Sequence, residues 1–159
     1  MTERTVDFAA LGRVSSRAEL KNIYLSEVSA KCGSRMSGTL EAALDNDAEV
    51  LVHEGNRLEV ACRYQFSVHV TRVQIAEATI EYVLVYELRG NKPFRKRDIA
   101  EFAFANGTLH SWPFMREFVY SLTSKMGLPP YTVPVFHFVP KPRQRKDVLA
   151  ADTSGTSNE

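Results

Sequence analysis

The sequence has few of the residues on which covalent cross-links and metal sites depend. It contains two cysteines, Cys32 and Cys62, which form no CxxC pair, and four histidines that lack the i, i+4 spacing of a metal site. Two isolated thiols in a chain without an export signal predict free cysteines rather than a disulfide. The sequence therefore predicts neither a resident metal nor a cofactor.

Long apolar runs and catalytic motifs are also missing. Residues 1–6 lead into no apolar run, so we expect neither a secretory signal nor a membrane-spanning helix, and hence a cytoplasmic protein. The absence of a Gly-rich phosphate loop and of a nucleophile elbow predicts that the chain is not an enzyme. A competing interpretation, a small β-rich enzyme or lipid carrier, requires an enclosed pocket with convergent polar groups.

Charge of one sign is not in excess either. The formal net charge of +1 gives no overall field that would attract nucleic acid or a membrane. Basic clusters occur at residues 92–97 and 141–146, but they lack the interleaved aromatic residues that stack on single-stranded bases. We therefore expect no nucleic-acid partner and no membrane insertion.

The length of 159 residues fits one domain with its own core. We place this domain at residues 18–139. Residues 1–17 are expected to be a flexible N-terminal segment. Residues 140–159, where prolines and arginines give way to small polar residues, are expected to be a disordered tail.

Alternation of apolar and polar residues predicts β-strands. The clearest example is residues 58–70, where every second residue is apolar or aromatic and most of the intervening ones are polar. A Gly-Asn turn at 55–56 connects residues 40–52 to this strand, and residues 76–88 continue the pattern after a further turn. With an earlier β-prone segment at residues 20–30, the sequence predicts a four-stranded antiparallel meander with one dry face.

Helical patterns replace the alternation after residue 90. Residues 95–104 predict a short helix, and Ser111 can cap a second helix that has Pro113 in its first turn. A Gly-Leu-Pro-Pro sequence ends this helix, and residues 131–138 are extended, apolar and interrupted by Pro134, which excludes a central strand. The predicted fold class is α+β, with the sheet followed by helices.

More apolar residues lie outside these elements than an isolated sheet needs. Met36, Trp112 and the apolar residues between 128 and 138 are the main examples. Such residues pack on the chain's own sheet, enter a subunit interface or line a groove for another chain. At the level of composition these three alternatives stay open.

Three segments carry a resemblance to a known family. An opening strand pattern at residues 20–28, the helix motif Trp-Pro-Phe-Met-Arg-Glu at 112–117 and the crossover Gly-Leu-Pro-Pro-Tyr-Thr-Val-Pro-Val at 127–135 follow one another in that order. Over residues 18–138 the chain resembles the SecB family of export chaperones. The helix motif and the crossover are more specific than the strands.

The resemblance implies an ATP-independent chaperone, a holdase, that binds unfolded preproteins or other non-native polypeptides for protein export and translocation. It implies a cytoplasmic homotetramer, a dimer of dimers, with long grooves lined by the second strand and the crossover. Flexible methionine and aromatic side chains suit such grooves because they repack against varied apolar segments. By position, the residues expected to line the client groove are Met36, Leu40, Leu44, Leu128, Tyr131, Val133, Phe136 and Phe138.

The polar face of the sheet carries the second implied site. In the SecB family an acidic patch on this face docks the export motor SecA, and the partner-docking residues expected here are Glu27, Glu77 and Glu81. Lys31 stands where a further acid is expected, and this charge reversal opposes SecA docking. An alternative interpretation is an adaptor protein that docks one partner through the same face.

Two further departures from the family bear on function. The tail from Pro140 has no counterpart of the helix that lids the family's groove, so we expect a more open groove. The Pro129-Pro130 pair resembles a SecB-like subset in which the chaperone guards the antitoxin of a toxin–antitoxin pair. A dedicated antitoxin client is therefore an alternative to export.

Overall fold

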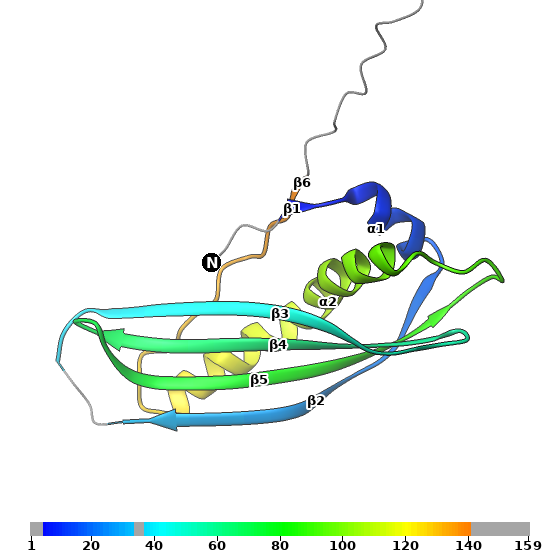
Figure 1. The fold of residues 1–159 in the computed structure, drawn as a ribbon. Helices are drawn as coiled ribbons and strands as arrows, with labels where there is room; N and C mark the ends of the chain where they lie inside the picture. Colours follow the sequence, from blue (N-terminus) through cyan, green and yellow to red (C-terminus); the bar gives the residue numbers. More distant parts are fainter. Residues whose placement is uncertain (1–4, 34–36, 141–159) are drawn as a thin grey trace, which may run out of the picture.

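The computed structural model describes residues 5–33 and 37–140, and Figure 1 shows the arrangement of their elements. In chain order these are β1 (Thr5–Val6), α1 (Phe8–Ser15), β2 (Ala18–Cys32), β3 (Leu40–Glu54), β4 (Arg57–Val70), β5 (Val73–Leu88), α2 (Lys96–Lys125) and β6 (Val139–Pro140). Met36 and the tail predicted to be disordered, from residue 141 onward, lie outside the described residues. Neither α1 nor α2, the helices of the described ranges, is long and apolar enough to cross a membrane.

The four long strands form one antiparallel sheet in the order β2-β5-β4-β3. The predicted α+β class and the four-stranded antiparallel sheet are thereby confirmed. The order differs from a simple meander, because only β3, β4 and β5 follow one another while β2 pairs with β5, from Ala18 opposite Leu88 to Cys32 opposite Ala76. Consequently β2 and β3 are the two edges of the sheet.

One face of the sheet is dry, as the alternation predicts. All seven apolar or aromatic residues at the alternate positions from Leu58 to Val70 in β4 are at most 3% exposed, and they meet the matching residues of β5. Helix α2 covers this face and packs mainly on β3 and β4 (Figure 1). The core therefore lies between one sheet layer and one helix layer.

Helix α2 is a single helix, so the prediction of two helices with a cap at Ser111 is wrong. Ser111 lies inside the helix, where its hydroxyl bonds the Gly107 carbonyl and the buried Tyr64 hydroxyl, both at 2.6 Å. Pro113 has no N–H to bond the Leu109 carbonyl four residues earlier, and Leu109 is exposed. The helix nevertheless continues through the proline to Lys125.

The residues between α2 and β6 contain no helix or strand, as expected for the segment 131–138 that Pro134 interrupts. We call residues 127–138 the crossover. At its end, β6 pairs in parallel with β1, with Thr5 opposite Val139. The sequence predicted no element before residue 18, whereas the structure has both β1 and α1 there.

Helix α1 is fixed to α2 by charge. Its N-cap Asp7 accepts hydrogen bonds from the amides of Ala9 and Ala10, which satisfies the first turn. Arg13 forms two hydrogen bonds of 2.7 and 2.9 Å with the carboxylate of Asp98, whose side chain is buried. The pair lowers the pKa of Asp98, first through the hydrogen bond from Arg13. Through β1 and α1 the start of the described chain thus reaches both β6, which follows the crossover, and α2.

Candidate functional site

An apolar pocket opens where the crossover passes the beginning of β3. Its volume is about 140 Å³. An apolar cavity of about 150 Å³ holds a benzene molecule, so this pocket has room for one large apolar side chain. The residues that line it come from β3, β4, α2 and the crossover: Leu40, Ala42, Val68, Thr123, Leu128, Pro129, Pro130 and Tyr131.

The pocket adjoins an unpaired strand edge. Within the described sheet β3 bonds to β4 alone, so the outer edge of Leu40–Glu54 has no partner strand. An extended polypeptide can add to such an edge through main-chain hydrogen bonds that do not depend on its sequence. The pocket and the edge together are suited to an extended segment that contributes a large apolar side chain.

Helix α2 holds the crossover by its backbone near the middle. Trp112 donates from Nε1 to the carbonyl of Pro134 at 3.0 Å, and Arg116 donates from Nε to the carbonyl of Val133 at 2.8 Å. Positions 112 and 116 are one helical turn apart, so both side chains reach the same side of α2. This gives a physical role to the tryptophan and arginine of the sequence motif at residues 112–117.

A second attachment lies at Thr123, one of the pocket residues. Its hydroxyl accepts a hydrogen bond from the Tyr131 amide at 3.0 Å, and its carbonyl accepts one from the Leu128 amide at 3.0 Å. The Tyr131 ring lies 5.7 Å from the ring of Phe66, centroid to centroid, and thus packs against the sheet at β4. The part of the crossover that borders the pocket is therefore attached to α2 at both of its ends.

The rest of the crossover is fastened by aromatic contacts. The ring centroids of Trp112 and Phe136 are 4.7 Å apart, those of Phe136 and Phe138 are 4.7 Å apart, and those of Phe138 and Phe104 are 6.3 Å apart. Contacts at these distances stabilise beyond the area that they bury. The aromatic residues of the crossover are thus packed on α2 in the described conformation.

The structure brings together only part of the predicted groove set. Leu40, Leu128 and Tyr131 line the pocket, and Leu44 follows on the same face of β3, half-buried against the core. Val133 is 1% exposed and belongs to the core in this conformation. Phe136 and Phe138 contact each other within the series of aromatic contacts that holds the crossover on α2, and Met36 is outside the described residues.

Several pocket residues were missed by sequence reasoning. Ala42 shares the alternation of Leu40 and Leu44, so the strand pattern contained the signal for it. Val68 is likewise on the dry face of its strand. Thr123 gave no signal, because a threonine in a helix is recognised as an anchor only once its partners are known.

The predicted docking residues lie on the face of the sheet that is turned away from α2, and they are largely paired. Glu81 accepts hydrogen bonds from Arg63 at 2.6 Å and from Ser26 at 2.8 Å. The hydrogen bond with Glu81 is the first cause of a raised pKa at Arg63. Glu27 stands opposite Glu81 in the register of β2 and β5. Cationic pairing therefore reduces the negative field of this face.

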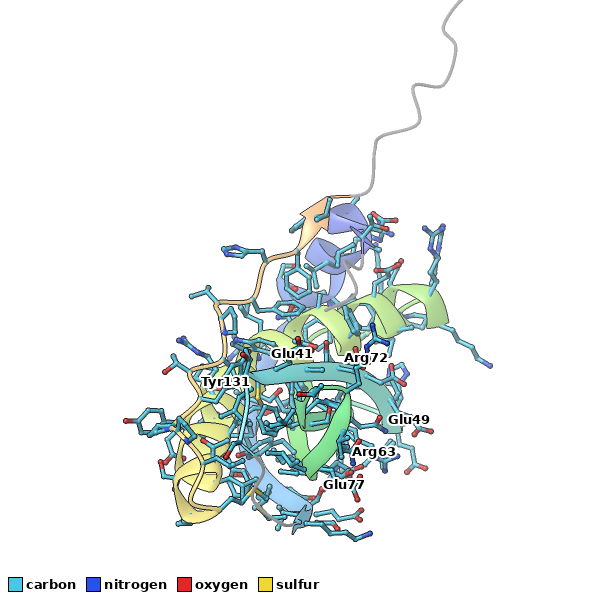
Figure 2. All side chains as sticks on the ribbon, turned by 90° about the vertical axis from the view of Figure 1, so that its left-hand side faces the viewer. Glu41, Glu49, Arg63, Arg72, Glu77 and Tyr131 are labelled. Carbon is cyan, nitrogen blue, oxygen red and sulfur yellow. The ribbon has the colours of Figure 1, made fainter. Side chains whose placement is uncertain are left out.

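Glu77 has a similar arrangement. It accepts a hydrogen bond from Gln74 at 2.7 Å and lies 3.5 Å from the ammonium group of Lys31. Figure 2 shows Glu77 and Arg63 on one side of the sheet and Tyr131 on the other. Thus Lys31, which replaces an expected acid, also neutralises a neighbouring one.

A larger hollow of about 440 Å³ lies on this outer face, but its chemistry differs. Charged, amide and hydroxyl side chains form most of its lining, including Lys31, Asp45, Gln65 and Glu77. Such a surface keeps its water when an apolar segment approaches, because an apolar segment cannot replace the hydrogen bonds that these polar groups make to water. By size alone this hollow would be the candidate site for an apolar segment, but the chemistry of the lining favours the smaller pocket beside β3.

A four-stranded antiparallel sheet, backed by one long helix and bordered by an extended crossover, is the architecture of the SecB-like chaperone fold. Among solved structures the chain is similar to the SecB-like chaperone of Mycobacterium tuberculosis, determined in complex with a ChAD peptide from the HigA1 antitoxin. The TM-score is 0.73 at 20% sequence identity, and the match covers 80% of this chain and 97% of that one. The predicted resemblance in fold is confirmed.

A more distant similarity is found with a protein of unknown function from Streptococcus agalactiae. The TM-score is 0.47 at 9% identity, over 74% of this chain and 97% of the other. No family model and no curated protein matches the sequence.

Proposed function

We propose that the protein is an ATP-independent holdase that binds extended, apolar segments of non-native polypeptides. The observation that carries this proposal is the apolar pocket beside the unpaired edge of β3. An unfolded chain offers the two features that this site can bind, namely a backbone that is free to pair with the strand edge and accessible large apolar side chains. Burial of one such side chain contributes about 1.5–3 kcal/mol, so a single pocket holds a client weakly and reversibly.

The test is suppression of aggregation by the purified protein without nucleotide. A chemically denatured model client is diluted into buffer with increasing protein, and light scattering is followed. We expect suppression at near-stoichiometric amounts, and Leu128→Ser with Tyr131→Ser should weaken it. The matched control is Glu77→Lys with Glu81→Lys on the opposite face, which should suppress as the wild type does. No suppression by the wild type at several-fold excess would exclude the holdase function.

The same control tests the adaptor alternative. If the protein docks one folded partner through its polar face, the two lysine substitutions should abolish capture of that partner and the two serine substitutions should not. SecA is the partner that the resemblance implies for an export role. Because Lys31 is 3.5 Å from Glu77 and thereby masks it, Lys31→Glu should strengthen SecA binding in a direct binding assay.

A dedicated antitoxin client is the second candidate task. It is favoured by the similar SecB-like chaperone, whose solved structure holds an antitoxin peptide. A chaperone dedicated to one client discriminates between sequences, whereas a general holdase does not. Isothermal titration of peptides from an antitoxin and from unrelated preproteins therefore separates the two tasks, and similar affinities for all peptides would exclude dedication.

We also propose that the protein works as a cytoplasmic homo-oligomer, in the family's arrangement a dimer of dimers. On the helix side of the sheet edge β2, large apolar residues are uncovered, with Leu25 at 40% and Val28 at 46% exposed. Phe114 of α2, which contacts Tyr82, is 48% exposed beside them. Contiguous apolar surface of this kind marks an interface. Light scattering that gives a monomer at micromolar concentration would contradict this assembly.

A further inference from the structure

The wall of the pocket that the crossover supplies, residues 128–131, has few means of holding its shape. Gly127 precedes it with φ of 70°, a left-handed conformation that glycine adopts without strain. Pro129 and Pro130 have no backbone N–H to donate. Only Leu128 and Tyr131 therefore have an N–H that can tie the wall to the rest of the molecule.

Both of these amides bond to the same residue. The Leu128 amide donates to the carbonyl of Thr123, and the Tyr131 amide donates to its hydroxyl, each at 3.0 Å. Every backbone donor of the wall is thus used on Thr123. Among the described residues, Trp112 and Arg116 also bond the crossover, but they do so beyond the wall, at the carbonyls of Pro134 and Val133.

The hydroxyl of Thr123 is suited to this task because it has two functions at once. As a donor it bonds back into its own helix, to the carbonyl of Val119 at 2.9 Å or of Tyr120 at 3.0 Å. This fixes the rotation of the hydroxyl and leaves a lone pair for the Tyr131 amide. The side chain is 1% exposed, so water does not compete for either bond.

We propose that Thr123 is the positioning residue of the binding site, which keeps the pocket shaped in the absence of a client. This inference rests on the proposed function and deepens it. The pocket is pre-organised, so a client's large apolar side chain enters without first ordering the wall. Without the hydroxyl bond, residues 129–131 are tethered only through Leu128 at one end and through the bonds beyond Tyr131 at the other.

Two substitutions isolate the hydroxyl. Thr123→Val keeps the shape of the side chain and removes the acceptor, while Thr123→Ser removes a methyl group and keeps the acceptor. Valine is more apolar than threonine, so in a rigid pocket Thr123→Val should bind an apolar group as well as the wild type or better. Weaker binding by this variant can therefore arise only if the wall moves.

The experiment has two measurements on the full chain. The first is amide hydrogen exchange at Tyr131 by NMR, with no client present. The second is fluorescence anisotropy of a labelled 15-residue peptide of Ser, Thr and Gln with three alternate Phe residues at its centre, compared with the same peptide carrying Ala instead. For Thr123→Val we expect exchange roughly tenfold faster and binding of the Phe peptide roughly fivefold weaker, the size of one net hydrogen bond.

Thr123→Ser should resemble the wild type in both measurements. The inference is overturned if Tyr131 exchange is unchanged in Thr123→Val, or if exchange accelerates while peptide binding stays equal or tightens. It is also overturned if Thr123→Ser loses binding as Thr123→Val does, because packing and not the hydroxyl then matters. If the wild type does not prefer the Phe peptide to the Ala peptide, the proposed function itself fails, which is a distinct outcome.

Discussion

Gly107 lets helix α2 approach strand β4 more closely than any other residue would. A Cβ atom at this position would lie 2.7 Å from the sulfur of Cys62 and 3.1 Å from a methyl group of Val60. In an open helix Gly→Ala stabilises by about 1 kcal/mol. Here the added methyl overpacks a closed interface, which costs about 1–3 kcal/mol. We therefore expect Gly107→Ala to be neutral to destabilising, by up to about 2 kcal/mol in the free energy of unfolding.

In a protein that also carries Cys62→Ala, we expect Gly107→Ala to be stabilising. Burial raises the pKa of the Cys62 thiol to about 12, so the substitution removes a neutral sulfur and no charge. The space that the sulfur leaves accepts the new methyl of Ala at 107, and the helix gain of about 1 kcal/mol then appears. The two substitutions should thus couple by about 1–3 kcal/mol in a double-mutant cycle.

The assay is urea unfolding of the four proteins, followed by far-UV circular dichroism at one fixed protein concentration. A fixed concentration is necessary because subunit association adds to apparent stability. The close contact between α2 and β4 would be refuted if Gly107→Ala alone stabilised the protein, as Gly→Ala does in an open helix. It would be refuted equally if the effects of the two substitutions were additive within about 0.5 kcal/mol.

Two further predictions concern the hairpin turn and the acid response. Thr71 and Arg72 join β4 to β5 with φ of 47° and 69°, a left-handed conformation that Asn-Gly adopts with less strain. Thr71→Asn with Arg72→Gly should therefore raise the free energy of unfolding in urea by about 1 kcal/mol. A loss of stability would contradict the turn geometry. Asp98 has a lowered pKa beside Arg13, so its contribution is present above about pH 4 and is lost as the pH falls through the lowered value. Asp98→Asn should therefore show a shallower loss of stability below pH 4 than the wild type, and parallel acid curves would contradict this.

The sequence predicted the faces of the sheet well because burial itself sets the period. In β4 the dry residues from Leu58 to Val70 recur at every second position, and no other arrangement of that strand hides them all. The order of the strands was less accessible. Alternation says which way a side chain points, but it does not say whether β2 pairs with β3 or with β5.

Local signals misled where tertiary packing decides. Ser111 and Pro113 are typical of a helix start, yet the buried side chains on both sides of them, from Phe102 to Met115, make one continuous helix more favourable than two. Helix α1 was not predicted because it is short and its fixation depends on Asp98, which is distant in the sequence. A charge pair of this kind becomes visible only in the folded chain.

The candidate site could likewise be predicted only in part from the sequence. Leu40, Leu128 and Tyr131 were predicted through the resemblance and lie together in the pocket. Val133 was predicted with them but faces inward, because the prolines of the crossover break the simple alternation that would have placed it. Thr123 was not predicted at all, although it bonds both amides of the pocket wall.

The pairing of β1 with β6 joins the first described strand to the last. Residues 127–140 follow β2 to β5 in the chain, so all four strands of the sheet emerge from the ribosome before these residues are available. The pocket wall and the pairing of β6 with β1 can therefore form only after these later residues have been made. A newly made copy therefore has the strands of its sheet before it has the wall of the pocket that we propose as the client site.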